Sequence, residues 1–412
     1  MRYLCTVVSL YGCSTSGEFS VTSTAFPATH FRNFDFVATD GTLYTIPPEA
    51  STTVSVSTAT PEPEDPRDNL IGVDVAGVRV FQRLTQKWLN QPRFPLNDIT
   101  ESCPPSHIRS LAVNLEYTIT ELSEKGSFCR VRRASAFLPD GSPHWLMVKV
   151  LDRNASDGIL RALQRDKATL EFLQVKKRDI SCQLVPHVAW ENQECELRTS
   201  VMSLAGDVSL SQLAETDEVK NLAALASIGA RGLELLRSLH SLGIVHGDIH
   251  MDNMVFFRRT VIGKTLRLID FGRARSFVDL ETQRHILAQQ LPLSSVEWSK
   301  SFLSIFELEG WLPTRRDDLW RLSEMLIDMI AGRRDLVALE STSSRERMLA
   351  YKRSRLSPTG PLADRLGGVD TVFIAFADYC SKLSFEARPD YETWIRRFAH
   401  LSAAATDRIY MF

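Results

Sequence analysis

Two aspartates and an asparagine in the second half of the chain have the residue types and spacing that phosphoryl transfer needs. Asp248 lies in the stretch from 243 to 255, Asn253 follows it by five residues, and Asp270 begins the tripeptide Asp-Phe-Gly after an apolar run. A carboxylate can accept or orient the proton of an attacking hydroxyl. Carboxylate and amide oxygens are ligands that Mg²⁺ prefers. The spacing therefore predicts Asp248 as a catalytic residue and Asn253 with Asp270 as metal ligands.

These three residues resemble the catalytic loop and the metal-binding loop of eukaryotic-type protein kinases, where they occur in the same order. The resemblance implies a lysine that holds the α- and β-phosphates of ATP. Lys149 lies in an apolar strand pattern from 144 to 151, about one hundred residues before Asp248, where this lysine is expected. Lys149 is therefore predicted to bind ATP.

The resemblance also implies an acidic partner for Lys149 on the following helical pattern, from 158 to 178, where Asp166 and Glu171 are the candidates. Kinases usually carry apolar residues four and seven positions after this acid. Asp166 meets both conditions with Leu170 and Leu173, whereas Glu171 meets only the first. Asp166 is therefore favoured, although its side chain is one methylene shorter than the usual glutamate.

The glycine-rich loop that covers the phosphates in kinases is only partly present. Its pattern G-x-G-x-x-G-x-V aligns with Glu124, Gly126, Cys129 and Val131, so only the middle glycine remains. Glycines let backbone N–H groups approach phosphate closely, and Cys129 loses part of that freedom. This erosion indicates weak activity. The predicted nucleotide-binding residues of the loop are Gly126, Ser127, Phe128 and Val131.

Several further segments resemble the casein kinase one and vaccinia-related kinase group in particular. Residues 279–286 resemble D-x-x-T-x-x-H-I, residues 315–322 resemble R-R-D-D-L-x-x-L, and residues 379–391 resemble Y-C-x-x-L-x-F-x-x-x-P-D-Y. Ser304-Ile305 occupies the place of Ser-Ile-Asn in this group. The motifs follow the correct order over about 285 residues, which makes the resemblance far more specific than any one of them.

The resemblance assigns two further roles. Residues 202–206 resemble the hinge M-E-L-L-G, whose backbone binds adenine, so Met202, Ser203 and Leu204 are predicted to contact the nucleotide. Members of the group use the second aspartate of R-R-D-D-L as an anchor for the backbone of the catalytic loop, and Asp318 occupies this place.

Two departures from the kinase pattern concern the catalytic loop itself. The common His-Arg-Asp is His246-Gly247-Asp248, and the lost arginine is the usual partner of an activation-loop phosphate, so control by loop phosphorylation is not expected. His250 replaces the usual lysine two residues after the aspartate, which is similar to aminoglycoside and choline phosphotransferases. His250 remains a predicted catalytic residue, but a neutral histidine stabilises the transferring phosphate less than lysine unless its pKa is raised.

Strand patterns come first and helical patterns follow, which predicts an α+β fold. With the resemblance, the expected fold is a bilobal protein kinase, with a small β-rich N-lobe holding one helix and a large helical C-lobe, preceded by a small β-rich region. The predicted divisions are a β-rich region at 1–48, a Pro/Ser/Thr-rich linker at 49–69, a connector or N-terminal extension at 70–114, and a kinase domain at 115–402, with its N-lobe at 115–202 and its C-lobe at 207–402.

Composition is that of an ordinary globular protein. The 412 residues are 44% hydrophobic and 24% charged, with a net charge of −2, which gives no indication of a nucleic-acid partner. The seven cysteines have no paired spacing, and no apolar run is long enough to span a bilayer. ATP use favours a cytoplasmic or nuclear location. Secretion is the alternative if residues 1–16, which favour a strand, form a signal peptide.

The combined prediction is an ATP- and Mg²⁺-dependent kinase that phosphorylates protein hydroxyls, most simply those of serine and threonine. A pseudokinase that acts as a scaffold or binding module is the main alternative, because of the eroded glycine loop. A small-molecule phosphotransferase is the second, because of His250. Substrates of the kinase group are acidic or already phosphorylated, and the candidate arginines for such a site are Arg273, Arg275, Arg315 and Arg316.

Overall fold

The fold is known from a computed structural model, in which the chain forms two compact units, Met1–Asp65 and Pro66–Phe412. In the first unit, β1 (Phe34–Val37) pairs antiparallel with β2 (Leu43–Ile46). The other residues of the predicted β-rich region and nearly all of the predicted linker lie outside the described residues. The structure describes residues 34–37, 43–46, 68–91, 107–111, 114–125, 129–151, 155–185, 187–189, 198–215, 222–257, 265–290, 303–331, 344–355, 362 and 371–403.

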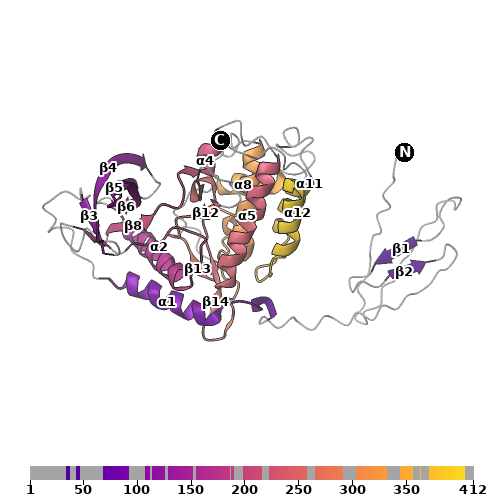
Figure 1. The fold of residues 1–412 in the computed structure, drawn as a ribbon. Helices are drawn as coiled ribbons and strands as arrows, with labels where there is room; N and C mark the ends of the chain where they lie inside the picture. Colours follow the sequence, from indigo (N-terminus) through magenta and orange to yellow (C-terminus); the bar gives the residue numbers. More distant parts are fainter. Residues whose placement is uncertain are drawn as a thin grey trace. The chain divides into compact units, whose positions relative to one another are not determined.

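An antiparallel sheet of six strands forms one part of the second unit (Figure 1). Its spatial order is β7-β3-β4-β5-β6-β8. The strands are β3 (His107–Ser110), β4 (Glu116–Lys125), β5 (Arg130–Phe137), β6 (Pro143–Val150), β7 (His187–Ala189) and β8 (Thr199–Ser203).

Alternation along these strands decides which residues form the core of the sheet. Successive side chains point to opposite faces of a strand. In β6, Leu146, Val148 and Val150 are therefore buried in one apolar cluster with residues of the neighbouring strands. Lys149 lies on the other face, directly across from Val131 of β5. The pleat thus turns the lysine away from the apolar cluster and toward the candidate site.

Two helices pack beside each other next to the sheet, α1 (Val75–Leu89) and α2 (Asp157–Val175) (Figure 1). Each begins at an N-cap side chain that satisfies an orphan amide. Asp74 Oδ1 accepts a hydrogen bond from Gly77 N at 2.7 Å, and Ser156 Oγ accepts one from Ile159 N at 3.4 Å. Helix α1 and strand β3 fall in the segment 70–114, for which the sequence left a connector or an N-terminal extension open. Both are integral parts of the second unit.

Helices dominate the rest of the second unit, residues 204–403, which we call the helical region (Figure 1). Helices α5 and α8 pack together, with α12 against α5 and α11 against α8. The helices are α4 (Leu210–Ala214), α5 (Leu222–Ser241), α7 (Ile305–Leu308), α8 (Arg315–Ala331), α10 (Arg345–Ser354), α11 (Thr371–Ser381) and α12 (Tyr391–Ala403). None of the helices in the described part of the chain has the length and apolar character that a bilayer crossing requires.

Short paired strands lie just before α4 and in the segment between α5 and α8. Strand β11 pairs with both β9 and β12, β10 pairs with β13, and β14 pairs with β15. The strands are β9 (Val208–Ser209), β10 (Ile244–Val245), β11 (Met254–Phe256), β12 (Arg267–Leu268), β13 (Arg275–Ser276), β14 (Val278–Asp279) and β15 (Arg284–His285), with short 3-10 helices at Asp68–Leu70 (η1) and Met251–Asn253 (η4). The architecture is therefore mixed α+β, as the order of patterns in the sequence predicts.

Candidate active site

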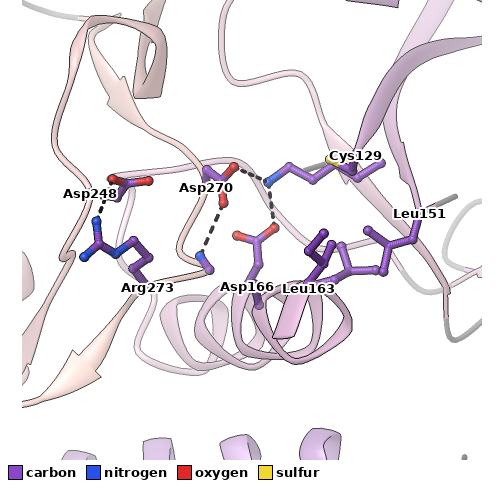
Figure 2. A pocket seen from close by; sticks show the side chains of 11 residues that line it. Cys129, Leu151, Leu163, Asp166, Asp248, Asp270 and Arg273 are labelled. Atoms are coloured by element: carbon purple, nitrogen blue, oxygen red, sulfur yellow. Dashed lines mark hydrogen bonds and ion pairs between the residues drawn. The ribbon is translucent and has the colours of Figure 1, made fainter. Parts of the chain in front are cut away.

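Lys149 lies between the carboxylates of Asp166 and Asp270, both of which Figure 2 labels. Its Nζ atom is 2.9 Å from Asp166 Oδ2 on α2 and 3.5 Å from Asp270 Oδ2. The Lys149 side chain is 8% exposed and that of Asp166 is 2% exposed, whereas Asp270 is 37% exposed and therefore open to a ligand. Burial alone would lower the pKa of Lys149, but the two carboxylates outweigh it and hold this pKa well above its usual value. Lys149 is therefore a fixed positive charge.

Asp166 joins the lysine to the Asp-Phe-Gly segment. While its Oδ2 atom binds Lys149, its Oδ1 atom accepts a hydrogen bond from Phe271 N at 2.8 Å. Glu171, the other candidate partner of Lys149, instead accepts hydrogen bonds from Lys87 and Trp88 of α1. The structure thus pairs Lys149 with the residue that the sequence favoured.

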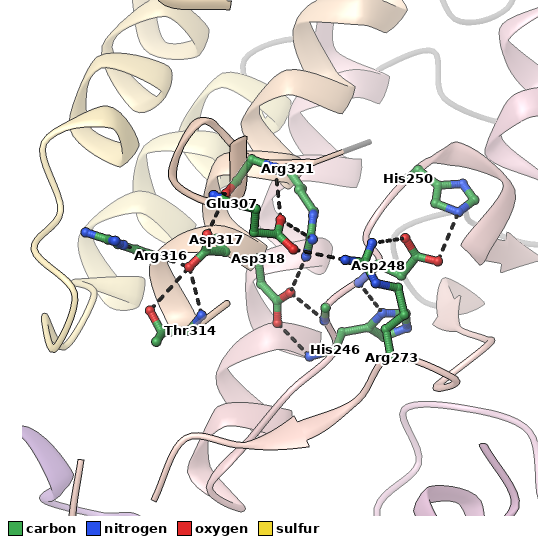
Figure 3. A network of polar contacts seen from close by, with 12 residues as sticks. His246, Asp248, His250, Arg273, Glu307, Thr314, Arg316, Asp317, Asp318 and Arg321 are labelled. Carbon is green, nitrogen blue, oxygen red and sulfur yellow. Dashed lines mark hydrogen bonds and ion pairs between the residues drawn. The ribbon is translucent and has the colours of Figure 1, made fainter. Parts of the chain in front are cut away.

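The catalytic-loop stretch follows α5, and its residues converge on Asp248. Asn253 Nδ2 donates to the Asp248 carbonyl oxygen at 2.9 Å, which fixes the loop between the two residues. Arg273 Nη1 lies 3.3 Å from Asp248 Oδ1, and His250 Nε2 lies 3.8 Å from Asp248 Oδ2 (Figure 3). Burial alone would raise the pKa of Asp248, but His250 and Arg273 outweigh it and hold this pKa far below its usual range. Asp248 is therefore ionised at neutral pH.

His250 lies between two carboxylates. Besides Asp248, it has Asp252 Oδ2 at 3.4 Å from its Nδ1 atom. Burial alone would lower the pKa of His250, but the two aspartates raise it to about 9. The Asp252 amide nitrogen also lies 3.3 Å from Nδ1, a contact that suits only the neutral ring. The carboxylates contribute the stronger interactions, so the protonated ring dominates at pH 7.

Asp318 at the start of α8 anchors the backbone of this loop. Its Oδ2 atom accepts from His246 N at 2.7 Å and its Oδ1 atom from Gly247 N at 2.9 Å. His240 Nε2 of α5 lies 2.9 Å from the same Oδ2 atom. Asp318 is fully buried, so these contacts replace its whole hydration shell. The geometry agrees with the anchoring role that the kinase-group resemblance assigns to it.

A continuous chain of buried charges connects Asp248 to α8 (Figure 3). Arg273 Nη2 lies 3.0 Å from Glu307 Oε1, and Glu307 Oε2 binds Arg321, whose Nη1 atom is 3.5 Å from Asp318 Oδ1. The side chains of Arg273, Glu307 and Arg321 are 11%, 5% and 1% exposed. Sequence reasoning missed the roles of Glu307 and Arg321, because nothing local signals a contact between segments so far apart.

Two of the four candidate arginines for an acidic substrate are buried. Arg315 is 3% exposed and its guanidinium carbon lies 4.6 Å from the centre of the Phe277 ring. Arg316 is 7% exposed, with its guanidinium carbon 3.8 Å from the centre of the Phe306 ring. A substrate-binding role at the surface is therefore wrong for both residues. They pack the N-terminal end of α8 against the preceding segments that carry Phe277 and Phe306.

The chemistry of the donors fits a hard divalent cation. Because Asn253 Nδ2 is committed to the Asp248 backbone, its Oδ1 atom is the one left for a metal. Asp270 adds a half-exposed carboxylate. No cluster of three or more His, Cys, Asp or Glu side chains suited to a metal occurs among the described residues. Two protein ligands suit Mg²⁺, which keeps waters and takes its remaining ligands from phosphates.

A pocket opens beside Lys149 (Figure 2), and Asp248 also faces it. It is lined by Cys129, Lys149, Leu151, Ile159, Ala162, Leu163, Asp166, Asp248, Asp270, Gly272 and Arg273. The polar members come from the catalytic loop, the Asp-Phe-Gly segment, β6 and α2, so the fold brings the predicted ionic residues to one cavity.

The predicted nucleotide-binding residues are placed less uniformly. Val131 lies across from Lys149, whereas Gly126, Ser127 and Phe128 lie outside the described residues. Met202 is buried at the end of β8, and Ser203 N already donates to Gln183 O at 2.8 Å. Neither these two nor Leu204 is among the pocket-lining residues that the structure describes. No model of a known protein family matches the chain.

Proposed function

We propose that this protein is an ATP- and Mg²⁺-dependent protein kinase that phosphorylates serine or threonine hydroxyls. The single observation that carries the proposal is the convergence of Lys149, Asp166, Asp270 and Asp248 on one pocket. In this proposal the six-stranded sheet with α2 is the N-lobe of a bilobal kinase fold, and the helical region is its C-lobe.

The charges of the site match the needs of phosphoryl transfer, in which positioning and charge stabilisation matter most. Lys149 would bind the α- and β-phosphates of ATP, and Asn253 with Asp270 would hold magnesium, which neutralises phosphate charge when bound. Asp248 stays ionised and can orient the acceptor hydroxyl and take its proton. Protonated His250 lies beside it and supplies a cation for the transferring group.

A hydroxyl that approaches Asp248 has to compete with Arg273, which already occupies Oδ1 at 3.3 Å. Oδ2 has His250 Nε2 at 3.8 Å and Asn253 Nδ2 at 3.5 Å, and both contacts are longer than that of Arg273 with Oδ1. The acceptor hydroxyl therefore binds at Oδ2 in this proposal. The arginine then fixes the rotation of the carboxylate rather than blocking it.

Two observations favour a pseudokinase as the second candidate: the eroded glycine loop and the engagement of Asp248 by Arg273. Such a protein would bind nucleotide through Lys149 without transferring phosphate. The two candidates make opposite predictions for transfer and the same prediction for nucleotide binding.

The deciding experiment incubates purified protein with labelled ATP and Mg²⁺, a panel of acidic and basic proteins, and small alcohols, beside Asp270→Ala. Phosphate transfer to protein that disappears in the variant supports the kinase. Transfer to a small alcohol supports a phosphotransferase. Thermal stabilisation by nucleotide without any transfer supports the pseudokinase.

Cys129 offers a separate test of where nucleotide binds. Its partly exposed thiol lines the pocket with Lys149, whereas Cys182 and Cys380 are buried. If ATP occupies this pocket, Mg²⁺-ATP slows alkylation of Cys129 by a maleimide, as followed by peptide mass spectrometry. Unchanged alkylation at saturating ATP would place the nucleotide elsewhere.

A further inference from the structure

Helix α1 connects the two parts of the site that the proposed reaction has to bring together. Its N-terminal end packs on the helical region. Asp74 N donates to the Ser241 carbonyl at the end of α5 at 2.8 Å, and Arg315 Nη1 of α8 donates to Asn69 O at 2.8 Å. Val78 is fully buried in a cluster with Val245, at the start of the catalytic loop. This end of the helix is therefore fixed to the catalytic-loop side of the site.

The packing at this end is close. A side-chain carbon added at Gly243 would lie 2.3 Å from Val78 Cγ2, and Gly243 has a φ of +77°. Only a residue without Cβ fits between α5 and α1 here. The turn that leads into the catalytic loop is thus shaped against α1.

The rest of α1 runs antiparallel to α2 along most of its length (Figure 1). Asp74 Oδ2 binds Lys176 at 2.6 Å near the C-terminal end of α2, and the Phe81 and Phe172 rings are 5.5 Å apart. Farther along, Trp88 reaches the middle of α2. The contacts include charge pairs, aromatic packing and a hydrogen bond, so α1 resists both sliding and rotation of α2.

Trp88 contacts two residues of α2 that lie on one face of this helix, next to and just beyond Asp166. Its Nε1 atom donates to Glu171 Oε2 at 2.7 Å, and the Lys167 ammonium lies 4.9 Å from the centre of its ring. Lys167 is the next residue after Asp166, and Glu171 lies slightly more than one turn beyond Asp166. The Trp88 contacts therefore hold the part of α2 that presents Asp166 to Lys149 and to Phe271 N.

From these contacts we infer that α1 is a built-in positioning element, which holds α2 where Asp166 meets both Lys149 and the Asp-Phe-Gly backbone. Trp88 of α1 and its acceptor Glu171 of α2 are the positioning residues. The site is then assembled by the chain itself, without a phosphate on an activation loop or a separate partner. The expected effect of α1 on the reaction rate rests on the proposed function, whereas its effect on the position of α2 does not.

The test replaces Trp88 with alanine and compares it with Arg83→Ala, an exposed residue on the same helix. Two quantities are measured: kcat/KM for ATP, and hydrogen exchange of the peptide that contains Phe271, whose amide donates to Asp166. We expect Trp88→Ala to lower kcat/KM about ten-fold and to speed this exchange. Arg83→Ala should change neither.

A double-mutant cycle separates positioning from general stability. In an Asp166→Asn background, Trp88→Ala should cause little further loss of kcat/KM, because the group that it positions is already disabled. If Trp88→Ala folds poorly, Glu171→Ala takes its place. Glu171→Gln, which keeps an acceptor for the indole N–H, should then restore most of the wild-type behaviour.

The outcomes distinguish this inference from the proposed function. If the wild type transfers phosphate and Trp88→Ala, or Glu171→Ala in its place, exchanges and reacts as the wild type does, the inference is overturned and the kinase proposal stands. If the wild type transfers no phosphate, the proposed kinase function is wrong. The hydrogen-exchange data alone then decide whether α1 positions α2. Faster exchange at Phe271 in Trp88→Ala supports the positioning element, and unchanged exchange overturns it.

Discussion

Two charged arrangements flank the pocket, and they are supported in different ways. On one side, Lys149 depends on Asp166 from a single helix and on the half-exposed Asp270. On the other side, Asp248 belongs to a chain of buried charges through Arg273, Glu307 and Arg321 to Asp318. The first has few connections and the second many. The difference teaches that the 243–255 loop is held by many contacts within the helical region, whereas the lysine side depends on the position of one helix, α2, which α1 holds in place.

The largest expected effect is a loss of stability on the side with many connections. It comes from a substitution of Asp318, which anchors the loop on that side. Asp318→Asn removes one of the two carboxylates beside the buried Arg321 guanidinium, and its amide group takes the place of an oxygen that accepts from His246 N or Gly247 N. Removing one partner of a buried ion pair costs about 3–5 kcal/mol. Urea unfolding should show this loss of stability. The exposed Asp378→Asn, which breaks a pair with Lys382 on the surface, should cost less than about 1 kcal/mol. If both variants lose the same free energy of unfolding, the buried charges contribute no more stability than the surface pair, and the prediction is wrong.

On the lysine side, Asp166→Asn should lower catalysis strongly while the chain stays folded, because Lys149 keeps Asp270 as a counter-charge. It removes the carboxylate that places the Lys149 ammonium, and such losses of electrostatic positioning cost about 10²- to 10³-fold in rate. The kcat/KM for ATP measures the effect, with circular dichroism as the check on folding. Asp179→Asn, at a position whose side chain is 83% exposed, is the matched control. A catalytic loss no greater than that of the control would remove Asp166 from the site.

The pH dependence tests the charge on His250. Its pKa is raised from 6.5 to about 9 in the folded protein, so the folded state holds this proton more tightly than the unfolded state. The resulting stability is fully present below about pH 6.5 and is lost as the pH rises through about 9. Transfer should likewise fall by about ten-fold above pH 9, because a charged contact to phosphate disappears.

Two variants make this pH test specific. His250→Lys should keep its activity beyond pH 9, since lysine retains its charge there. His250→Gln should be slow at every pH and lose the alkaline limb of the profile. An alkaline fall of the same size in the glutamine variant would assign the titration to another group.

The smallest effect is expected at the exposed edge of the α1 contact. Lys87 lies 2.9 Å from Glu171 Oε1, but its side chain is 54% exposed and Trp88 also binds Glu171. Exposed ion pairs contribute at most about 1 kcal/mol. Lys87→Ala should therefore change kcat/KM less than about two-fold, in contrast to Trp88→Ala. A ten-fold loss would show that charge, rather than the indole contact, holds α2.

Much of the architecture could be predicted from local patterns. The choice of Asp166 followed from apolar residues four and seven positions later, and these residues, Leu170 and Leu173, are each 1% exposed. A helical period links the face that packs in the core to the position of the acid. The prediction of Lys149 followed from its spacing to Asp248 and from the kinase resemblance, and strand alternation explains why its side chain lies on the face opposite the apolar cluster. Local periodicity thus fixed which side of an element each of these charges occupies.

What escaped prediction depends on contacts between distant segments. Strand β3 is only four residues long and begins just after two prolines, so it lacks a readable alternation. Glu307 was not recognised as a partner of Arg273 and Arg321, because each of the three lies on a different segment. Spacing within one segment cannot signal such pairs. Only the packing of α7 and α8 brings them together.

Gly247 has a consequence for how this loop can change by mutation. Its φ is +76°, and a Cβ at this position would lie 2.8 Å from the carbonyl oxygen of Arg273. An arginine at this position, as in His-Arg-Asp, would therefore push away the backbone that carries Arg273 and disturb its pairs with Asp248 and Glu307. The effect of a substitution at Gly247 thus depends on the Arg273 backbone, so the two positions do not vary independently under mutation.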